Sequence, residues 1–231
     1  VQKLDSGGNL LWVKQMKCSI TGYGTSITTD YLGNVLISGN FLDTVDLDPG
    51  VGVFNLISTG GNSLYDFFIL KLDLNGDFVW AKKTGGISND NSRSITTDAQ
   101  GNIIITGSFQ DTVDFDPGLA VFDLISTGFS DIFVQKLDGA GNFLWAKGFG
   151  GMNGASGVSI ITDSRSNVIV TGYFSETVDF DPGVGVSNHT SSGSIDIFIL
   201  KIDLNGNIVW AKSMGGNDTD LGVSIADDDN N

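Results

Sequence analysis

The stretch DIFVQKLDGAGNFLWAKGFGG, residues Asp131–Gly151, decides the fold. It contains two short runs rich in β-branched and aromatic residues, Asp131–Asp138 and Phe143–Gly151, joined by GAGN. Such runs around a Gly-Asn corner predict an antiparallel hairpin. The equivalent turns DLNGD at Asp73 and DLNGN at Asp203 contain Asn-Gly, which predicts a type I′ turn.

This hairpin belongs to a repeat. The four tryptophans, Trp12, Trp80, Trp145 and Trp210, are separated by 68, 65 and 65 residues. The three prolines, Pro49, Pro117 and Pro182, repeat the intervals 68 and 65. A fixed period of this kind indicates a repeat architecture with a unit of about 65 residues.

Each unit contains a second hairpin. Ser92–Asp98 and Ile103–Phe109 flank the turn AQGN, and a loop carrying TVDFDPG then leads to the next strand. Two hairpins per unit, with alternation of period two and no helical periodicity, predict an all-β protein made of four-stranded antiparallel blades, as in a β-propeller. We expect the inserted loops of all units to lie on one rim.

The period divides the chain into a partial blade (1–17), three blades (about 18–84, 85–149 and 150–214) and a partial blade (215–231), whose LGVSIAD is predicted to form a strand. This gives fifteen strands, one fewer than a four-bladed ring requires. A fragment of a larger ring is therefore predicted. Because VQKLDSGGN at Val1 matches VQKLDGAGN at Val134, we expect both ends to be cuts within a longer array, with further blades of the parent chain as neighbours.

The unit DIFVQKLDGAGNFLWAKGFGG, followed by GVSIITD and NVIVTGYF, resembles the bacterial seven-bladed β-propeller repeat (SBBP). The aspartate-led strand, the Gly-Asn turn, the tryptophan strand and the double glycine recur in order over nearly the whole chain. The inserted TVDFDPG departs from the ordinary unit of roughly 40 to 50 residues. The resemblance implies a β-propeller and a surface or secreted bacterial protein of unassigned activity.

Composition limits the possible partners. Apolar residues make up 40% of the chain, enough for a core, and 27 acids against 12 bases give a net charge of -15. That charge repels nucleic acid and anionic lipid. The longest apolar runs fall far short of the ~20 residues that cross a bilayer. We therefore expect a protein or glycan partner at a blade rim, no nucleic acid and no membrane span.

The corner motif carries the candidate metal ligands. Carboxylates recur at positions i, i+3 and i+5, and alternate residues of an extended segment face the same way. Clustered carboxylates with loop carbonyls suit Ca²⁺, the one cofactor that the sequence suggests. The alternative is that each acid accepts a turn amide while Pro-Gly fixes the corner, with Val113 and Phe115 packed inward. The candidate calcium ligands are Asp43, Asp46, Asp48, Asp111, Asp114, Asp116, Glu176, Asp179 and Asp181.

Three further features have two interpretations each. DLNGD at Asp73 matches the start of a calcium loop, but its counterparts lack the ligands, which favours a hairpin turn. Cys18 is either an exposed thiol or, as we predict, a small buried hydrophobe. His189, the single histidine, lies in a polar loop without a counterpart in the other units, which predicts a surface residue rather than a zinc ligand.

The tryptophans could serve as sugar platforms, but their recurrence in every unit favours packing between blades. No serine lies in a nucleophile elbow, and the acids repeat with the fold, whereas a catalytic site is normally unique. We predict no catalytic residues and a non-enzymatic scaffold, extracellular or at a bacterial cell surface, that binds a protein or glycan. The alternatives are a structural spacer of a large adhesin and a carboxylate-based glycan hydrolase.

Overall fold

The computed structural model describes residues 1–61 and 63–228, and every regular element in these ranges is a β-strand. Three four-stranded antiparallel units form the body, each joining consecutive hairpins in the order 1-2-3-4. The fourth strand of the middle unit also pairs with a short inserted hairpin, which makes that sheet six-stranded. We call the three units blades II, III and IV. Blade II comprises β4 (Thr21–Thr29), β5 (Val35–Leu42), β8 (Asp66–Leu72) and β9 (Phe78–Thr84); blade III β10 (Asn91–Thr97), β11 (Ile103–Phe109), β14 (Asp131–Leu137) and β15 (Phe143–Gly151); blade IV β16 (Ala155–Thr162), β17 (Val168–Phe174), β20 (Asp196–Ile202) and β21 (Ile208–Met214).

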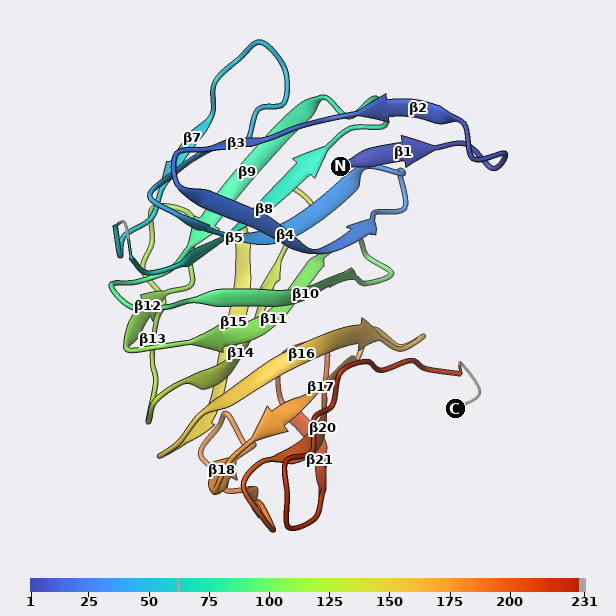
Figure 1. Cartoon of the computed structure of the whole chain (residues 1–231). Helices are drawn as coiled ribbons and strands as arrows, with labels where there is room; N and C mark the ends of the chain where they lie inside the picture. The colour runs from blue at the N-terminus through green and yellow to red at the C-terminus, as the bar shows by residue number, and fades with distance from the viewer. Residues whose placement is uncertain (62, 229–231) are drawn as a thin grey trace.

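Blade I has two strands, β1 (Gln2–Leu4) and β2 (Leu10–Val13), which correspond to the third and fourth strands of the other blades. The blades follow one another so that the first strands β4, β10 and β16 lie side by side (Figure 1). The propeller-like arrangement is not closed. No helix in the described part of the chain has the length and apolarity needed to cross a bilayer.

First strands of neighbouring blades are joined by polar contacts. The Thr25 hydroxyl is 3.2 Å from that of Ser92, and the Thr162 hydroxyl donates to the Thr97 carbonyl at 3.1 Å. Apolar clusters fill the space between blades, with the rings of Phe67 and Phe133 stacked 4.9 Å apart. Burial of these aromatic rings is the main favourable contribution to blade packing.

The inserted loops are hairpins rather than irregular corners. They comprise β6 (Thr44–Asp46) with β7 (Asn55–Ile57), β12 (Thr112–Asp114) with β13 (Asp123–Ile125), and β18 (Thr177–Asp179) with β19 (Asn188–Thr190). We call them the rim hairpins. All three lie on the same side of the molecule, at the left of Figure 1, as expected.

Two of the three rim hairpins pair with an outgoing strand of the preceding blade. Gly150 and Gly151, at the end of β15, pair with Asp179 and Val178 of β18. The short strand β3 (Lys17–Cys18) pairs with β6 in the same way. The rim hairpin therefore extends the outgoing strand of its neighbour and adds backbone hydrogen bonds between blades.

Two local predictions are wrong. LGVSIAD forms no strand in the described residues, because no strand described there pairs with it. The Asn-Gly turns are not type I′, which needs positive φ at both central residues. Gly76 has φ 77°, but Asn75 is not in the left-handed region. The register instead shifts at Lys71 and Leu72, so the hairpin contains a bulge.

Candidate functional site

The predicted calcium ligands, which we call the corner acids, all lie within or at the start of the rim hairpins. Asp111 has φ 57° and begins its hairpin in the left-handed region; its carboxylate accepts the Ser88 hydroxyl. Asp114 Oδ1 accepts the backbone N–H of Asp116 at 3.0 Å and of Phe122 at 2.8 Å. Asp116 Oδ1 accepts Gly118 N–H at 2.7 Å. The motif thus closes the loop between β12 and β13.

The other two copies place their acids similarly. Asp43 and Glu176 also have positive φ, and Asp46 and Asp179 each accept two backbone N–H groups. Asp48 and Asp181 each accept one, from Gly50 and Gly183. The structure thus brings together the second and third acids of each motif.

No group of three or more His, Cys, Asp or Glu side chains in the described ranges is arranged to hold a metal ion. The calcium site therefore stays a prediction of the sequence. The apolar residues between the acids do pack inward: Val113 and Phe115 are fully buried, and Phe115 meets Phe109 edge-on at 5.4 Å. Phe115 thereby fixes the rim hairpin to its own blade.

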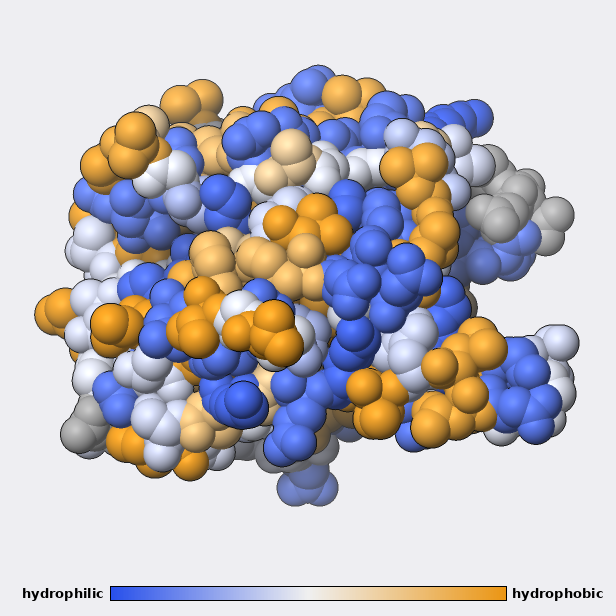
Figure 2. Space-filling model, turned by 90° about the horizontal axis from the view of Figure 1, so that it is seen from above, coloured by the Kyte–Doolittle hydropathy of each residue, from blue (hydrophilic) through white to orange (hydrophobic). Residues whose placement is uncertain are grey.

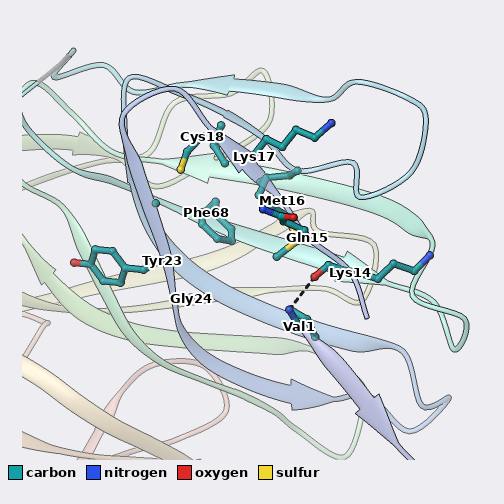
Figure 3. Close-up of a pocket in the computed structure, with 12 residues that line it drawn as sticks. Val1, Lys14, Gln15, Met16, Lys17, Cys18, Tyr23, Gly24 and Phe68 are labelled. Carbon is teal, nitrogen blue, oxygen red and sulfur yellow. Dashed lines mark hydrogen bonds between the residues drawn. The ribbon is translucent and has the colours of Figure 1, made fainter. Parts of the chain in front are cut away.

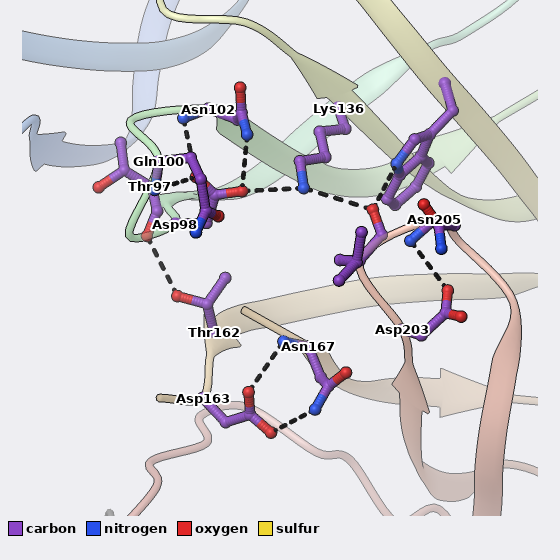
Figure 4. Close-up of polar contacts among 12 residues, drawn as sticks. Thr97, Asp98, Gln100, Asn102, Lys136, Thr162, Asp163, Asn167, Asp203 and Asn205 are labelled. Carbon is purple, nitrogen blue, oxygen red and sulfur yellow. Dashed lines mark hydrogen bonds and ion pairs between the residues drawn. The ribbon is translucent and has the colours of Figure 1, made fainter. Parts of the chain in front are cut away.

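A second recurring site lies at the end of each sheet away from the rim hairpins. It is formed by the turn between the first and second strands of a blade. The Asp98 carboxylate accepts the backbone N–H groups of Gln100 and Asn102 and the Asn102 side-chain amide (Figure 4). Its Oδ2 also pairs with Lys136 Nζ at 2.8 Å. Burial alone raises the pKa of Asp98, but the hydrogen bonds from Lys136 and Asn102 outweigh it and hold the pKa below its usual value.

The same lysine reaches the next blade. Lys136 Nζ lies 3.4 Å from the Leu204 carbonyl, to which Trp145 Nε1 donates at 3.1 Å. Blade II repeats the contact from Lys71, which pairs with Asp30 at 3.0 Å and donates to the Gly139 carbonyl at 2.9 Å. The tryptophan and the lysine therefore act between blades, as the packing interpretation of the tryptophans predicts.

Blade IV retains the pair, with a half-buried lysine. Lys201 lies 2.8 Å from Asp163. Burial raises the pKa of Asp163, but the Lys201 and Asn167 hydrogen bonds are stronger and lower it to about 2. This aspartate–lysine pair recurs because it joins the first turn of a blade to its third strand. Sequence reasoning missed it, although a lysine at the sixth position of each third strand was a visible signal.

Three further acids, also missed, begin the third strands of the blades. Asp66, Asp131 and Asp196 are 0, 3 and 2% exposed. In each of them Oδ1 has no hydrogen-bond partner within the described residues. Each Oδ2 accepts one backbone N–H, from Thr59, Thr127 and Ser192 respectively. A buried carboxylate with an unused oxygen is costly unless a cation or proton compensates it.

Asp131 borders a cavity of about 340 Å³ between blade III and the rim hairpin of blade IV. Burial raises the pKa of Asp131, although the N–H and hydroxyl donors of Thr127 oppose the shift. Asp179 and Asp181 also line this cavity. This cavity is therefore lined both by two predicted acids of the corner motif, Asp179 and Asp181, and by a buried acid that sequence reasoning did not identify, Asp131.

A second cavity, of about 240 Å³, lies beside blade I (Figure 3). Its walls include Met16, Cys18, Tyr23 and Phe68, and the Val1 ammonium donates to the Lys14 carbonyl at 2.9 Å. It lies between the residues of blade I and strands β4 and β8 of blade II.

Two single residues differ from expectation. Cys18 is exposed, not buried, because it lies on β3 at the outer end of blade I, where the other copies have Gly86 and Gly151. His189 has a counterpart: β19 aligns with β13, so His189 takes the place of Leu124. It is half-buried, packs against Phe180 at 5.5 Å and lies 2.9 Å from the Ser213 hydroxyl.

Comparison with known proteins finds two relatives that match over part of their length. No family model matches the chain. An uncharacterized WD repeat-containing protein of Acanthamoeba polyphaga mimivirus is 32% identical over 194 residues, 73% of this chain but 14% of the relative. The regulatory protein FlaEY of Caulobacter vibrioides is 30% identical over 99 residues, 43% of this chain and 10% of that protein. The chain thus spans a small part of either relative.

A crystal structure of a protein of unknown function from Bacteroides caccae shares 11% identity over 90% of this chain and 87% of its own, with a TM-score of 0.31. A score this low carries no argument. The likeness to a WD repeat-containing protein agrees with the repeat, β-propeller-like architecture.

Proposed function

We propose that this chain is a non-enzymatic scaffold of the SBBP repeat type, extracellular or at a bacterial cell surface, that binds a partner protein through its rim hairpins. The order of motifs supports the family, and the repeat architecture supports a binding role. The observation that carries the proposal is the chemistry of the hairpin tips.

Each tip exposes two aliphatic side chains directly after the Pro-Gly corner. Val51, Leu119 and Val184 are 107, 105 and 109% exposed, as much as in a free chain. Val53, Val121 and Val186 follow at 70, 71 and 72%. Single exposed apolar residues need no explanation, but the same pair on three rigid tips along one side forms a candidate contact surface. Apolar side chains also protrude along the left edge of Figure 2, the side of the rim hairpins in Figure 1.

Acids flank these tips. Asp46 and Asp48 precede Val51, and the same order recurs at Leu119 and Val184. An apolar centre with a charged rim is typical of protein interfaces. The net charge of -15 favours a partner whose own surface combines apolar and basic side chains.

The test compares the wild type with a triple variant, Val51→Ser, Leu119→Ser and Val184→Ser, against displayed peptide and protein libraries and a glycan array. Leu32→Ser, Leu74→Ser and Leu204→Ser form the matched control, because these leucines are 59, 51 and 51% exposed at the turns of the opposite sheet end. We expect protein ligands of the wild type to bind the control variant and to lose at least tenfold in affinity for the tip variant.

Ligands that bind the tip variant as well as the wild type would place the binding surface elsewhere. Binding confined to glycans would replace the protein partner, and turnover of a glycan would contradict a non-enzymatic role. The absence of any ligand would favour the spacer.

A further inference from the structure

Blade II shows how a buried aspartate of this series is neutralised. Lys83, near the end of β9, places its ammonium 2.9 Å from Asp66 Oδ2. The same ammonium donates to the Thr59 hydroxyl. Asp66 is fully buried, so this pair compensates a charge that water does not reach.

Blade III keeps the acid and the threonine but lacks the lysine. Repeat alignment places Gly148 where blade II has Lys83, within AKGFGG and AKKTGG. Thr127, the counterpart of Thr59, donates its N–H and hydroxyl to Asp131 Oδ2 at 2.9 and 3.0 Å. Within the described residues Asp131 forms no ion pair, whereas Asp66 pairs with Lys83. Asp131 Oδ1, like that of Asp66, has no hydrogen-bond partner there.

The missing side chain leaves room that can be occupied. The cavity of about 340 Å³ includes Gly148 and Asp131 in its walls, together with Thr127. Phe122 and Leu124 supply an apolar wall for an alkyl chain. A Cβ added to Gly148 would lie 3.4 Å from Phe109 and 3.7 Å from Leu124, so the site accepts a side chain without a clash.

Other charged groups around this cavity are two acids and one base. Asp179 and Asp181 come from the rim hairpin of blade IV and favour a cation. Lys147 also lines the cavity, but its side chain extends across Gly206 of the next blade. Three acids against one base leave the cavity with a net negative charge.

We propose that this cavity binds a primary alkylammonium group, as a lysine side chain or a free alkylamine. The ammonium occupies the place of Lys83 Nζ and donates to Asp131 and Thr127, while its alkyl chain packs on Phe122 and Leu124. An ammonium carries three N–H donors, which suits one carboxylate and one hydroxyl. A metal ion such as Ca²⁺ needs six to eight oxygen ligands. The inference is independent of the partner proposed for the hairpin tips.

The test titrates the full chain with n-butylammonium chloride and with N-acetyl-lysine methylamide, followed by NMR shifts of the Thr127 and Asp131 amides. Neutral n-butanol is the matched probe. We expect saturable binding of both amines with Kd on the order of millimolar, and at least tenfold weaker binding of butanol.

Two variants test the site without removing the buried acid. Gly148→Lys supplies the internal ammonium of blade II and should abolish binding. Lys83→Gly removes that ammonium and should create an additional site at Asp66, which raises the stoichiometry by one amine per chain. Far-ultraviolet circular dichroism confirms that each variant is folded.

Unchanged amine binding in Gly148→Lys, or butanol binding as strong as amine binding, would overturn the proposal, as would a folded wild type that binds neither amine. Tighter binding of the lysine derivative would identify a lysine side chain as the ligand. Equal affinities would identify a free alkylamine.

Discussion

Asp90 makes stability depend on pH. It is buried, accepts the N–H groups of Gly86 and Gln110, and lies near Asp66 and Asp111. Burial, and then these two acids, raise the pKa of Asp90 to about 7 from 3.8 despite both hydrogen bonds. The folded chain therefore holds this proton more tightly than the unfolded chain does. The protonated Asp90 therefore adds to the free energy of unfolding. This stabilisation is fully present below about pH 4 and is lost as the pH rises to about 7.

We predict that the free energy of unfolding falls between pH 4 and pH 7 by up to about 4 kcal/mol through this group. Asp98 and Asp163 have lowered pKa values, so their effect on the free energy of unfolding changes below pH 4, outside this window. Burial raises the pKa of Asp131, whose effect has the same sign as that of Asp90, so the comparison with the variant isolates Asp90. Urea unfolding at several pH values measures the slope. In Asp90→Asn the slope should be much shallower, and an equal slope in the variant would contradict the assignment.

The buried pair of Asp98 and Lys136 gives a sharper residue-scale prediction. Asp98→Ala leaves Lys136, which is 4% exposed, without its carboxylate. We expect a loss of about 3 to 5 kcal/mol in the free energy of unfolding. Asp138→Ala is the matched control, because Asp138 closes the same kind of turn without a lysine, and it should cost about 1 kcal/mol. Equal losses of the free energy of unfolding in the two variants would show that the turn hydrogen bonds stabilise the fold and that the ion pair with Lys136 does not.

At the scale of the element, the rim hairpin depends on glycines in the preceding blade. A Cβ at Gly151 would lie 1.9 Å from the Thr177 carbonyl, so Gly151→Ala must disturb the pairing of β15 with β18. We predict a loss of about 2 kcal/mol and at least tenfold faster hydrogen exchange at Val178. Gly148→Ala lies on the same strand but has space for its Cβ. It should change neither the free energy of unfolding nor the hydrogen exchange rate at Val178. Normal protection of Val178 in Gly151→Ala would argue against this pairing.

The corner acids also belong to this scale, because they act through the hairpin loop. Asp46, Asp114 and Asp179 each commit one oxygen to two backbone N–H groups. We therefore expect coincident thermal melts with excess calcium and with chelator at fixed ionic strength. A rise of several degrees with calcium, absent from the double variant Asp114→Asn and Asp116→Asn, would instead support the calcium site.

The blade strands could be predicted from the sequence because Trp80, Trp145 and Trp210 recur in register with long runs of period two. The pairing of β15 with β18 could not, since two glycines carry no pattern and their partner is about 28 residues further along. The acids of the corner were predicted as a group, and the structure shows which backbone N–H groups the second and third acids of each motif accept. The cavity at Asp131 depends on one difference between the blades, which is Gly148 in place of Lys83. Only superposition of the blades shows that this glycine leaves the place of an ammonium empty beside a buried acid.

At the scale of the whole molecule, stability should follow the number of complete blades. Blade I has two strands, and its exposed Leu10, Leu11 and Val13 show that its surfaces are poorly covered. Repeat proteins gain stability from each unit and from each interface between units. Because Val1 aligns with Val134, residues 85–133 placed before Val1 would supply the two missing strands and a rim hairpin.

We predict that this extended chain unfolds at a higher temperature and with a larger dependence on urea, since more surface is exposed on unfolding. A Gly/Ser-rich extension of equal length is the control, and it should change neither quantity. The cavity of Figure 3 should close as well. Cys18 should be protected from alkylation, because the added segment includes Gly128, which lies against the backbone of Gly151, the counterpart of Cys18, in blade III. If the extension raised neither the melting temperature nor the urea dependence, the blades would be independent units, and the contacts from Lys136 and Trp145 to the next blade would contribute little to stability.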